Sequence, residues 1–365
     1  MEPVDALHEI AFWLERDLAP TFKVKAFRTA AAAIDGVDRP GLEARLASGA
    51  LARTKGVGSR SLEVIGQALG GSVPDYLEAL RDTERETLSD AGEALLGQLR
   101  GDLHAHSDWS DGGSPVELMV DTAALLGREY LAITDHSPSL KVAHGLDADR
   151  LTEQLDLLEA IRASPPARPD RRPTASGPAD DTRAADATAP SAVRVLSGIE
   201  VDILEDGTLD QTPQMLDRLD VVVASVHSKL RADSRTMTER MLGGIRDPHT
   251  NVLGHCTGRL VQGGRGERPQ SAFDARAVFD ACAASGVAIE INSRPERQDP
   301  PDDLIAAALD AGCLFSIDTD AHAPGQLDFL RLGAERAASN GVPTDRIVTT
   351  WPVDRLLAWT AARRS

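Results

Sequence analysis

The chain has 365 residues, of which 42% are hydrophobic and 26% are charged, and its formal net charge at pH 7 is −18. This composition is typical of a soluble globular protein with a large core, and the length predicts two or three domains. No apolar run approaches the ~18 residues of a membrane span, the acidic start MEPVDALHEIAFWLERDL is unlike a secretory signal, and three scattered cysteines favour a reducing compartment, so a cytoplasmic protein without membrane contact is expected.

Residues 1 to about 97 are predicted to be helical. Leu7, Ile10, Leu14 and Leu18 recur at helical spacing, and the alanine-rich segment FKVKAFRTAAAAI follows. The segment TKGVGSRSLEVIGQAL places a Gly-Val-Gly turn before another amphipathic stretch. The overall charge disfavours non-specific nucleic-acid binding, but eight cations against three anions between residues 23 and 60 form a locally basic region.

From residue 99 short β-branched or apolar runs alternate with helical patterns. The seven predicted strands are LRGDLHAH, EYLAITDH, RVLSGIEVD, LDVVVASVH, NVLGHC, VAIEIN and CLFSIDTDAH. Alternating strands and helices indicate parallel βα units, so we expect an α/β fold, a distorted TIM-like barrel, with an open doubly wound sheet as the alternative.

The expected domains are an all-α domain at 1–97, the barrel at 98–350 and a helical tail at 351–365. Residues 164–192 interrupt the barrel with a stretch rich in Pro, Ala, Asp and Arg that has almost no large apolar side chains. Such a stretch buries too little surface to offset its ordering entropy, so it is predicted to be a disordered insertion.

Six of the seven predicted strands end in, or are followed by, residue types that bind metal ions. Because the carboxyl ends of parallel barrel strands meet at one rim, these side chains are expected to converge. A single His-x-His pair is rarely a metal site, but the recurrence at the same end of six strands is unlike a chance pattern. Imidazoles and carboxylates without thiolates favour two or three ions of Zn²⁺, Mn²⁺ or Fe²⁺, bridged by a carboxylate such as Glu200. The candidate ligands are His104, His106, Asp111, His136, Glu200, His227, His255, Asp320 and His322.

Other polar residues near the strand ends have weaker expected roles. Asp135 is expected to hydrogen-bond a neighbouring histidine, and Asp318 to support the ligands from behind. Lys229, Arg259, Asn292 and Arg294 are candidates for holding a phosphate. Lys141 and His144 are further candidates for facing the substrate.

The strand-end motifs carry a resemblance to a known family. DLHAHSDWSDG, LAITDHS, SGIEVDI, VASVHSKL, VLGHCTGRL, EINSRPERQD and SIDTDAH occur in the order found in the PHP (polymerase and histidinol phosphatase) family, which residues 99 to about 345 resemble. The resemblance implies a distorted seven-stranded barrel, a trinuclear metal centre held by the nine candidate ligands, and phosphoester hydrolysis by a metal-activated hydroxide.

Residues 5 to about 80 resemble the N-terminal domain of family-X DNA polymerases, with FKVKAFRTAAAAI matching a basic helix and TKGVGSRSLEVIGQAL a helix-hairpin-helix. Backbone N–H groups of such a hairpin hold a DNA phosphate without reading bases. The expected DNA contacts are Lys23, Lys25, Arg28, Lys55, Gly56, Val57, Gly58 and Arg60. The barrel follows almost directly, which leaves no room for a polymerase palm, so no polymerase activity is expected. Val64 stands where animal relatives have a Schiff-base lysine, so no lyase is expected.

Together these patterns predict a metal-dependent phosphoesterase that acts on DNA in repair, as a 3′-5′ exonuclease, a 3′-end phosphatase or an abasic endonuclease. The alternative is a phosphomonoesterase for a small metabolite of the histidinol-phosphatase type, which the overall acidic charge favours. A third hypothesis is a DNA-binding adaptor whose metal site is structural.

Overall fold

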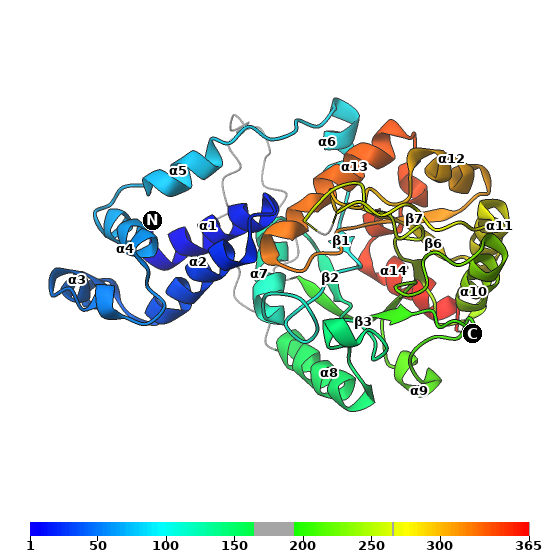
Figure 1. Ribbon diagram of the computed structural model, residues 1–365, viewed down its shortest axis with the longest axis horizontal. Coiled ribbons are helices and arrows are strands. Elements are labelled where there is room, and N and C mark those ends of the chain that lie inside the picture. Colours follow the sequence, from blue (N-terminus) through cyan, green and yellow to red (C-terminus); the bar gives the residue numbers. More distant parts are fainter. Residues whose placement is uncertain (164–192, 265, 365) are drawn as a thin grey trace. The chain divides into compact units, whose positions relative to one another are not determined.

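The computed structural model describes residues 1–163, 193–264 and 266–364. These divide into two compact units, an N-terminal unit of Met1–Thr87 and a barrel unit that starts at Leu88 (Figure 1). The predicted disordered insertion, 164–192, lies outside the described residues. Within the described ranges, none of the helices combines the length and hydropathy that a membrane span requires.

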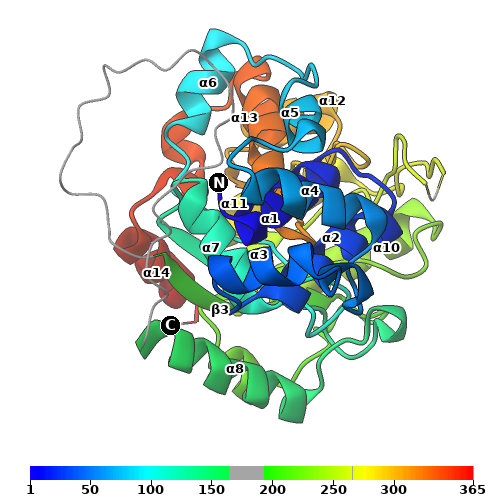
Figure 2. The same ribbon diagram turned by 90° about the vertical axis from the view of Figure 1, so that its left-hand side faces the viewer.

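The N-terminal unit is all helical, as the sequence predicts. It consists of α1 (Pro3–Arg16), α2 (Thr21–Ile34), α3 (Arg39–Ala47), the 3-10 turn η1 (Leu51–Arg53), α4 (Ser59–Leu69) and α5 (Asp75–Arg81). Helices α1 and α2 lie side by side (Figures 1 and 2), and their apolar stripes meet at the fully buried Leu7, Ile10 and Ile34. The Arg81 guanidinium joins α5 to α1 through Glu9, at 2.7 Å.

The barrel unit contains seven parallel strands that neighbour each other in chain order. They are β1 (Gly101–Asp102), β2 (Tyr130–Ile133), β3 (Arg194–Asp202), β4 (Val221–Ser225), β5 (Val252–Leu253), β6 (Ala288–Asn292) and β7 (Leu314–Asp318). At the carboxyl end Ala105 bridges Ala321, and the His106 N–H donates to the Ala321 carbonyl at 2.8 Å. The sheet is thus a nearly closed, distorted barrel, and the alternative of an open sheet is wrong.

Helices surround the strands (Figure 1). They are α7 (Val116–Leu125), η2 (Lys141–Ala143), α8 (Ala148–Ala163), α9 (Pro213–Leu216), α10 (Ser234–Arg246), α11 (Ala275–Ser285), α12 (Asp302–Asp310), η3 (Pro324–Phe329) and α13 (Leu330–Ser339). Because both faces of the sheet are covered, the strands are largely buried, and every residue of β4 is buried.

Two further helices extend the barrel unit. Helix α6 (Asp90–Leu96) packs on α13, and the backbone N–H of Ser89 donates to the Glu335 carboxylate at 2.9 Å. Helix α14 (Val353–Ala362), which follows η4 (Thr344–Arg346) and η5 (Val348–Thr350), buries Leu356 in a cluster with residues at the amino ends of the strands. The region expected as a tail therefore covers the barrel end opposite the carboxyl rim.

Candidate metal centre

The carboxyl ends of the strands bring the nine candidate ligands to one rim of the barrel. His104 and His106 follow β1, and His136 follows β2. Glu200 lies inside β3, while His227 and His255 each come two residues after β4 and β5. Asp320 and His322 follow β7, and Asp111 lies in the loop after β1. The regular spacing arises because each parallel strand ends at the same level of the barrel.

Glu200 is the centre of this arrangement and is 1% exposed. Its Oε1 lies 2.8 Å from His255 Nε2 and 3.2 Å from His227 Nε2. Its Oε2 lies 2.9 Å from His136 Nδ1, 3.3 Å from His104 Nε2 and 3.5 Å from His106 Nε2. One buried carboxylate thus faces five imidazoles, as expected for a bridging ligand.

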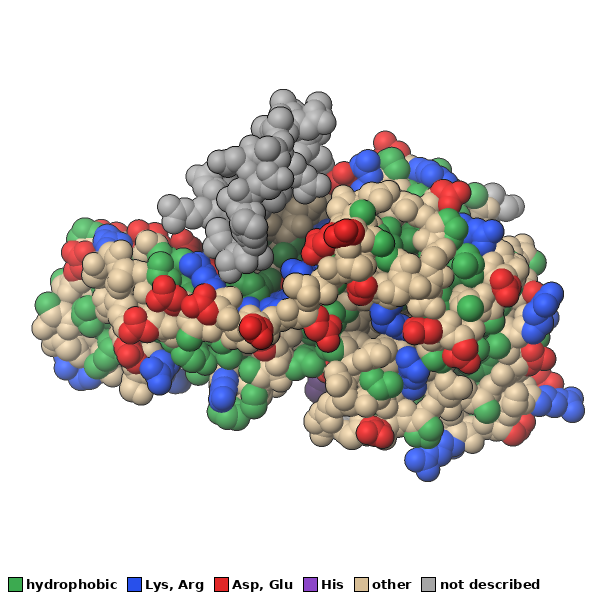
Figure 3. Space-filling view, turned by 90° about the horizontal axis from the view of Figure 1, so that it is seen from above, with side chains coloured by type: hydrophobic (Ala, Val, Ile, Leu, Met, Phe, Trp, Pro, Cys, Tyr) green, Lys and Arg blue, Asp and Glu red, His purple; other side chains and the backbone are tan. Residues whose placement is uncertain are grey.

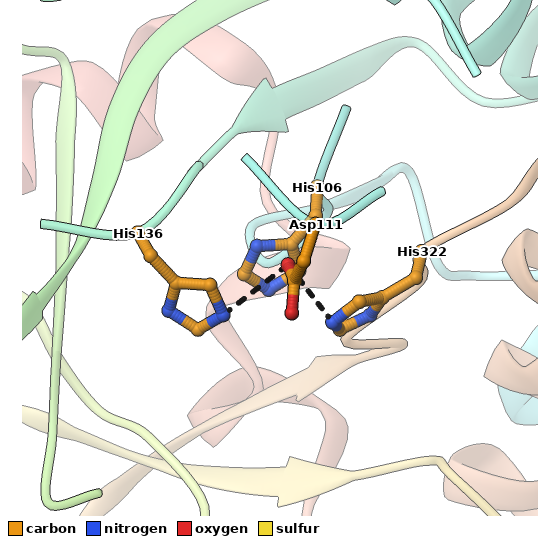
Figure 4. Close-up of side chains that lie close together, drawn as sticks. All are labelled: His106, Asp111, His136 and His322. Atoms are coloured by element: carbon orange, nitrogen blue, oxygen red, sulfur yellow. Dashed lines mark ion pairs between the residues drawn. The ribbon is translucent and has the colours of Figure 1, made fainter. Parts of the chain in front are cut away.

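Three groups of side chains have ligand atoms within 4.8 Å of one another. They are His106 with Asp111, His136 and His322; His104 with His106 and Asp320; and His136 with Glu200 and His227. Figure 4 shows the first group, in which His106, His136 and His322 converge on Asp111 from three different loops. His255 belongs to none of the three groups, and its ring Nε2 lies 2.8 Å from Glu200 Oε1.

The electrostatics of the groups fit divalent cations. Burial would raise the pKa of Glu200, but His227, His104 and His136 hold it well below its ordinary value. Burial would lower the pKa of His227, yet Glu200 and Asp202 raise it to about 10. Without cations, a proton on His227 balances part of the carboxylate charge.

The unsatisfied atoms point to the same conclusion. Within the described part of the chain, His104 Nε2, both ring nitrogens of His106, His227 Nε2 and Glu200 Oε2 are buried and have no hydrogen-bond partner. Such orphaned groups are rare and costly inside proteins. Divalent ions would satisfy nitrogen lone pairs and carboxylate oxygens together, so the residues present fit a metal centre.

Two buried carboxylates that the sequence reasoning missed orient the histidines. Glu290 accepts from His104 Nδ1 at 2.6 Å and also accepts the backbone N–H of His255. Asp202 accepts from His227 Nδ1 at 2.9 Å. In both cases Nε2 is left facing Glu200, which is the tautomer needed to bind a metal. The sequence signal that could have revealed these two carboxylates is an acidic residue two positions away from a polar residue at the strand end. Side chains two positions apart in a strand lie on the same face of the sheet.

A third missed residue is Arg297, whose Nε donates to Asp320 Oδ2 at 2.8 Å. Burial would raise the pKa of Asp320, but Arg297, His106 and His104 hold it well below its ordinary value. Asn292 also donates to Asp320, at 3.2 Å. Asn292 therefore lies at the centre, as expected, but its described contacts position a carboxylate.

The two aspartates that were expected to support the ligands differ in how well their contacts agree with that expectation. Asp135 does not contact a histidine, and this part of the prediction is wrong: its oxygens accept from the Ser107 and Ser110 hydroxyls and from Gln154, so it holds the loop that carries Asp111. Asp318 does lie behind the centre, where it accepts the Leu103 N–H at 2.8 Å beside His104.

The residues expected to hold a phosphate differ in their exposure and in the groups that they contact. Lys229 is exposed and has a left-handed backbone, φ 54°. Arg294 lies at the centre, 3.0 Å from His322 Nδ1. Arg259 donates to the backbone carbonyls of Arg297 and Gln298, so its guanidinium braces a loop, and its expected contact with a phosphate stays a prediction. Lys141 and His144 are exposed in the loop after β2.

Of the cations expected to contact DNA, Lys23, Lys25 and Lys55 are exposed. Arg60 is exposed as well, although it lies 2.8 Å from Glu63. Arg28 is different, because it forms a part-buried ion pair with Glu15 at 2.7 Å and a 2.9 Å contact with His8. The structure thus removes Arg28 from the expected DNA contacts: its charge joins α2 to α1.

The expected hairpin glycines have distinct roles. Gly56 has φ 95°, and a Cβ there would lie 2.7 Å from Thr29 Cγ2, so a side chain would be strained and would press on α2. Val57 is buried. Gly58 precedes α4 as its N-cap and has open space beside it. The turn is thus packed on one side and open on the side of the α4 amino end.

Comparison with known protein families shows to which family the chain belongs. The family model of the PHP domain matches residues 102–294, which includes the end of β1, the five strands β2 to β6 and seven of the nine candidate ligands. The chain belongs to the PHP domain family. Its barrel is accordingly that of a metal-dependent phosphoesterase, a hydrolase.

Individual relatives of this PHP protein differ in their described activity. It is 33% identical over 266 residues to the DNA polymerase/3′-5′ exonuclease PolX of Bacillus subtilis, covering 73% of this chain and 42% of the relative. It is 31% identical over 139 residues to the probable phosphatase YcdX of Escherichia coli K12, covering 36% and 53%. The matches thus span about half the length of these curated relatives or less. A solved histidinol phosphate phosphatase from Lactococcus lactis aligns with 66% of this chain and 92% of its own at a TM-score of 0.43 and 17% identity.

Proposed function

We propose that this PHP protein hydrolyses phosphodiester bonds at DNA ends as a 3′-5′ exonuclease that acts in DNA repair. The observation that supports the proposal is the similarity to PolX, which is 33% identical over 266 residues and covers 73% of this chain, a longer stretch than the match of residues 102–294 to the PHP domain model. That relative is named as a 3′-5′ exonuclease as well as a DNA polymerase. A 3′-end phosphatase or an abasic endonuclease would use the same centre.

We further propose that the nine candidate ligands hold two or three divalent ions, with Zn²⁺, Mn²⁺ or Fe²⁺ as the candidates. Such ions, when bound, lower the pKa of coordinated water and neutralise charge on phosphate oxygens. The chain's own residues supply orientation. Glu290 and Asp202 hold His104 and His227 with Nε2 toward Glu200, and Arg297 and Asn292 hold Asp320.

The N-terminal unit, Met1–Thr87, is proposed as a helix-hairpin-helix domain that binds the DNA backbone without reading bases, since α6 of the expected domain 1–97 packs with the barrel unit. Exposed Lys23, Lys25 and Lys55 supply charge, and the open turn at Gly58 leaves backbone N–H groups of α4 accessible to a phosphate. Polymerase and lyase activity are not expected, for the reasons of sequence given above.

A second candidate function is hydrolysis of a small phosphomonoester. The similarity to the probable phosphatase YcdX favours it. So does the mixed surface of the barrel unit, where acidic and basic side chains are interspersed on the face drawn in Figure 3 rather than gathered into one basic field.

A paired assay with Mn²⁺ or Zn²⁺ separates the two functions. One substrate is end-labelled duplex DNA with a recessed 3′ end, the other is histidinol phosphate, and His104→Ala is the control. We expect the wild-type protein to shorten the DNA from its 3′ end and the variant to lose this activity. Hydrolysis of histidinol phosphate alone would overturn the proposal, and metal-dependent folding without any hydrolysis would favour a structural metal site.

A further inference from the structure

A hollow of about 410 Å³ lies beside the metal centre of the barrel unit. This volume is within the range of about 300–1,000 Å³ that small-molecule sites occupy. Its walls come from the loops after β2, β3 and β4, namely Ser139, Leu140, Asp202, Leu204, Glu205, Asp206, His227 and Ser228. Because His227 belongs both to this acidic pocket and to the candidate metal groups, an occupant would extend directly from the metal centre.

The charge of the acidic pocket restricts its occupant. Among the described residues that line it there are three carboxylates, Asp202, Glu205 and Asp206, and no lysine or arginine. Asp206 stays ionised, because hydrogen bonds from the Thr208 hydroxyl and N–H lower its pKa. A phosphate group in this pocket would face these like charges, and no lysine or arginine among the described lining residues would pair with it.

Asp202 also provides an available acceptor. It is 5% exposed, and its Oδ1 accepts from the His227 ring at 2.9 Å and the His227 N–H at 3.2 Å. Its Oδ2 has no hydrogen-bond partner within the described ranges. A carboxylate oxygen of this kind at the pocket wall accepts hydrogen bonds, so it favours an occupant that brings a donor.

We propose that the acidic pocket receives the terminal nucleoside of a DNA strand that ends in a free 3′-hydroxyl. The inference rests on the proposed function and deepens it. A scissile phosphodiester joins two nucleosides, and an internal nucleoside carries another phosphate on its far side, whereas the terminal one does not. The pocket therefore excludes internal nucleosides and 3′-phosphate ends by charge.

Neutral groups of the terminal nucleoside match the walls. Its 3′-hydroxyl donates to a carboxylate, and its sugar and base pack against Leu140 and Leu204. In the reaction, the oxygen of a water molecule bonds to phosphorus and the bond to O3′ of the preceding nucleotide breaks. One proton of the water passes to that O3′, and a nucleoside 5′-monophosphate is released. The site thus cuts one nucleotide at a time rather than within the strand.

Calorimetric binding tests the pocket independently of turnover. The probes are thymidine 5′-monophosphate and thymidine 3′,5′-bisphosphate, titrated into the full-length protein with Mn²⁺. We expect the monophosphate to bind about 10- to 100-fold more tightly, since the second phosphate enters the acidic wall. Glu205→Gln should narrow this ratio, and Asp206→Asn, which keeps an acceptor for Thr208, serves as the second variant. Glu159→Gln, an exposed position on α8, is the matched control and should leave the ratio unchanged.

Excision rates on two oligonucleotides, one ending in a 3′-hydroxyl and one in a 3′-phosphate, separate failure of the pocket from failure of the function. Faster removal from the 3′-hydroxyl end, with a smaller preference in Glu205→Gln, supports the proposal. DNA degradation at equal rates on both ends overturns the pocket while exonuclease activity stands. No degradation of either DNA, with hydrolysis of a small monoester, overturns both.

Discussion

At the scale of single residues, the candidate metal centre depends on carboxylates that do not themselves face the ions. Glu290 and Asp202 each accept a hydrogen bond from the Nδ1–H group of a histidine, which directs the other ring nitrogen to Glu200. Such partners raise ligand basicity and fix ring orientation. The pairing also explains why both acids are buried despite their charge.

Replacing Glu290 tests this role. We expect Glu290→Gln to weaken metal affinity by about 10- to 100-fold, because the amide bears no charge to hold the His104 Nδ1 proton. Competition with a coloured chelator measures the affinity, and circular dichroism checks that the fold is intact. Glu159→Gln is the control, and an affinity equal to that of the wild type would show that Glu290 does not orient the ligand.

The pKa values of the histidines predict how the metal-free protein responds to pH. The pKa of His227 rises from 6.5 to about 10, so its stabilisation is complete below 6.5 and is lost as pH rises toward 10. Burial lowers the pKa of His106 to about 3, so its contribution is complete above 6.5 and does not change in this window.

We therefore expect the Tm of the chelator-treated protein to fall between pH 7 and 10, and that of the Mn²⁺-loaded protein to fall less or to rise. Metal ions replace the protons in the loaded state, and ligand deprotonation favours binding. Thermal unfolding at fixed ionic strength measures both curves. If the Tm of the metal-free protein increased between pH 7 and 10, this would contradict the inference that protonated His227 stabilises the fold.

At the scale of elements, function is placed at the ends of helices and strands. The strands supply the ligands at one rim, while the turn before α4 supplies the proposed phosphate contact. In the N-terminal unit, the close approach of Gly56 to α2 fixes the conformation of the turn. The Arg28 guanidinium forms an ion pair with Glu15, which joins α2 to α1. The cations left exposed for the proposed DNA contact include Lys23, Lys25 and Lys55.

Lys55 tests the hairpin. We expect Lys55→Ala to weaken DNA binding equally for different sequences and to reduce the slope of log affinity against log salt by about 1, as for loss of one phosphate contact. Fluorescence anisotropy at several salt concentrations measures both quantities. Arg235→Ala removes an exposed cation on α10 in the barrel unit and should leave the slope unchanged. An unchanged slope in Lys55→Ala would contradict the proposed hairpin contact.

At the scale of the whole molecule, the chain has two units with separate cores. Helix α6 packs with the barrel unit, so the natural boundary for truncation follows Thr87. The division suggests that capture of DNA and hydrolysis are separable, with binding by one unit raising the effective concentration of substrate at the other.

Removing residues 1–87 should therefore leave hydrolysis of a small phosphate ester unchanged and lower kcat/KM on DNA by about 10²-fold or more. Steady-state kinetics of the truncated and full-length proteins on both substrates measures this. Equal losses on the two substrates would indicate that the N-terminal unit supports the barrel instead of binding DNA.

Much of the fold and of the site could be predicted from the sequence, because both depend on periodic patterns. Runs of apolar residues ending in His, Asp or Glu predicted seven parallel strands with a shared rim, and the barrel confirms that arrangement. The pattern could not reveal the roles of Glu290 or Arg297, since the sequence does not show which residue a polar side chain in a strand or loop contacts. Nor could it show that the Arg28 guanidinium pairs with Glu15 or that the Arg259 guanidinium donates to a backbone carbonyl.

The sequence by itself determined which residue types lie at each strand end, and hence the fold class, the family and the candidate ligands, because strand period and chain order are local properties. Only the tertiary structure decided which charges meet: Glu200 among five imidazoles, Glu290 behind His104, Arg28 against Glu15, and three carboxylates around the pocket beside His227. These pairings join residues distant in the chain, and electrostatic energies depend on separation and burial, which packing alone sets.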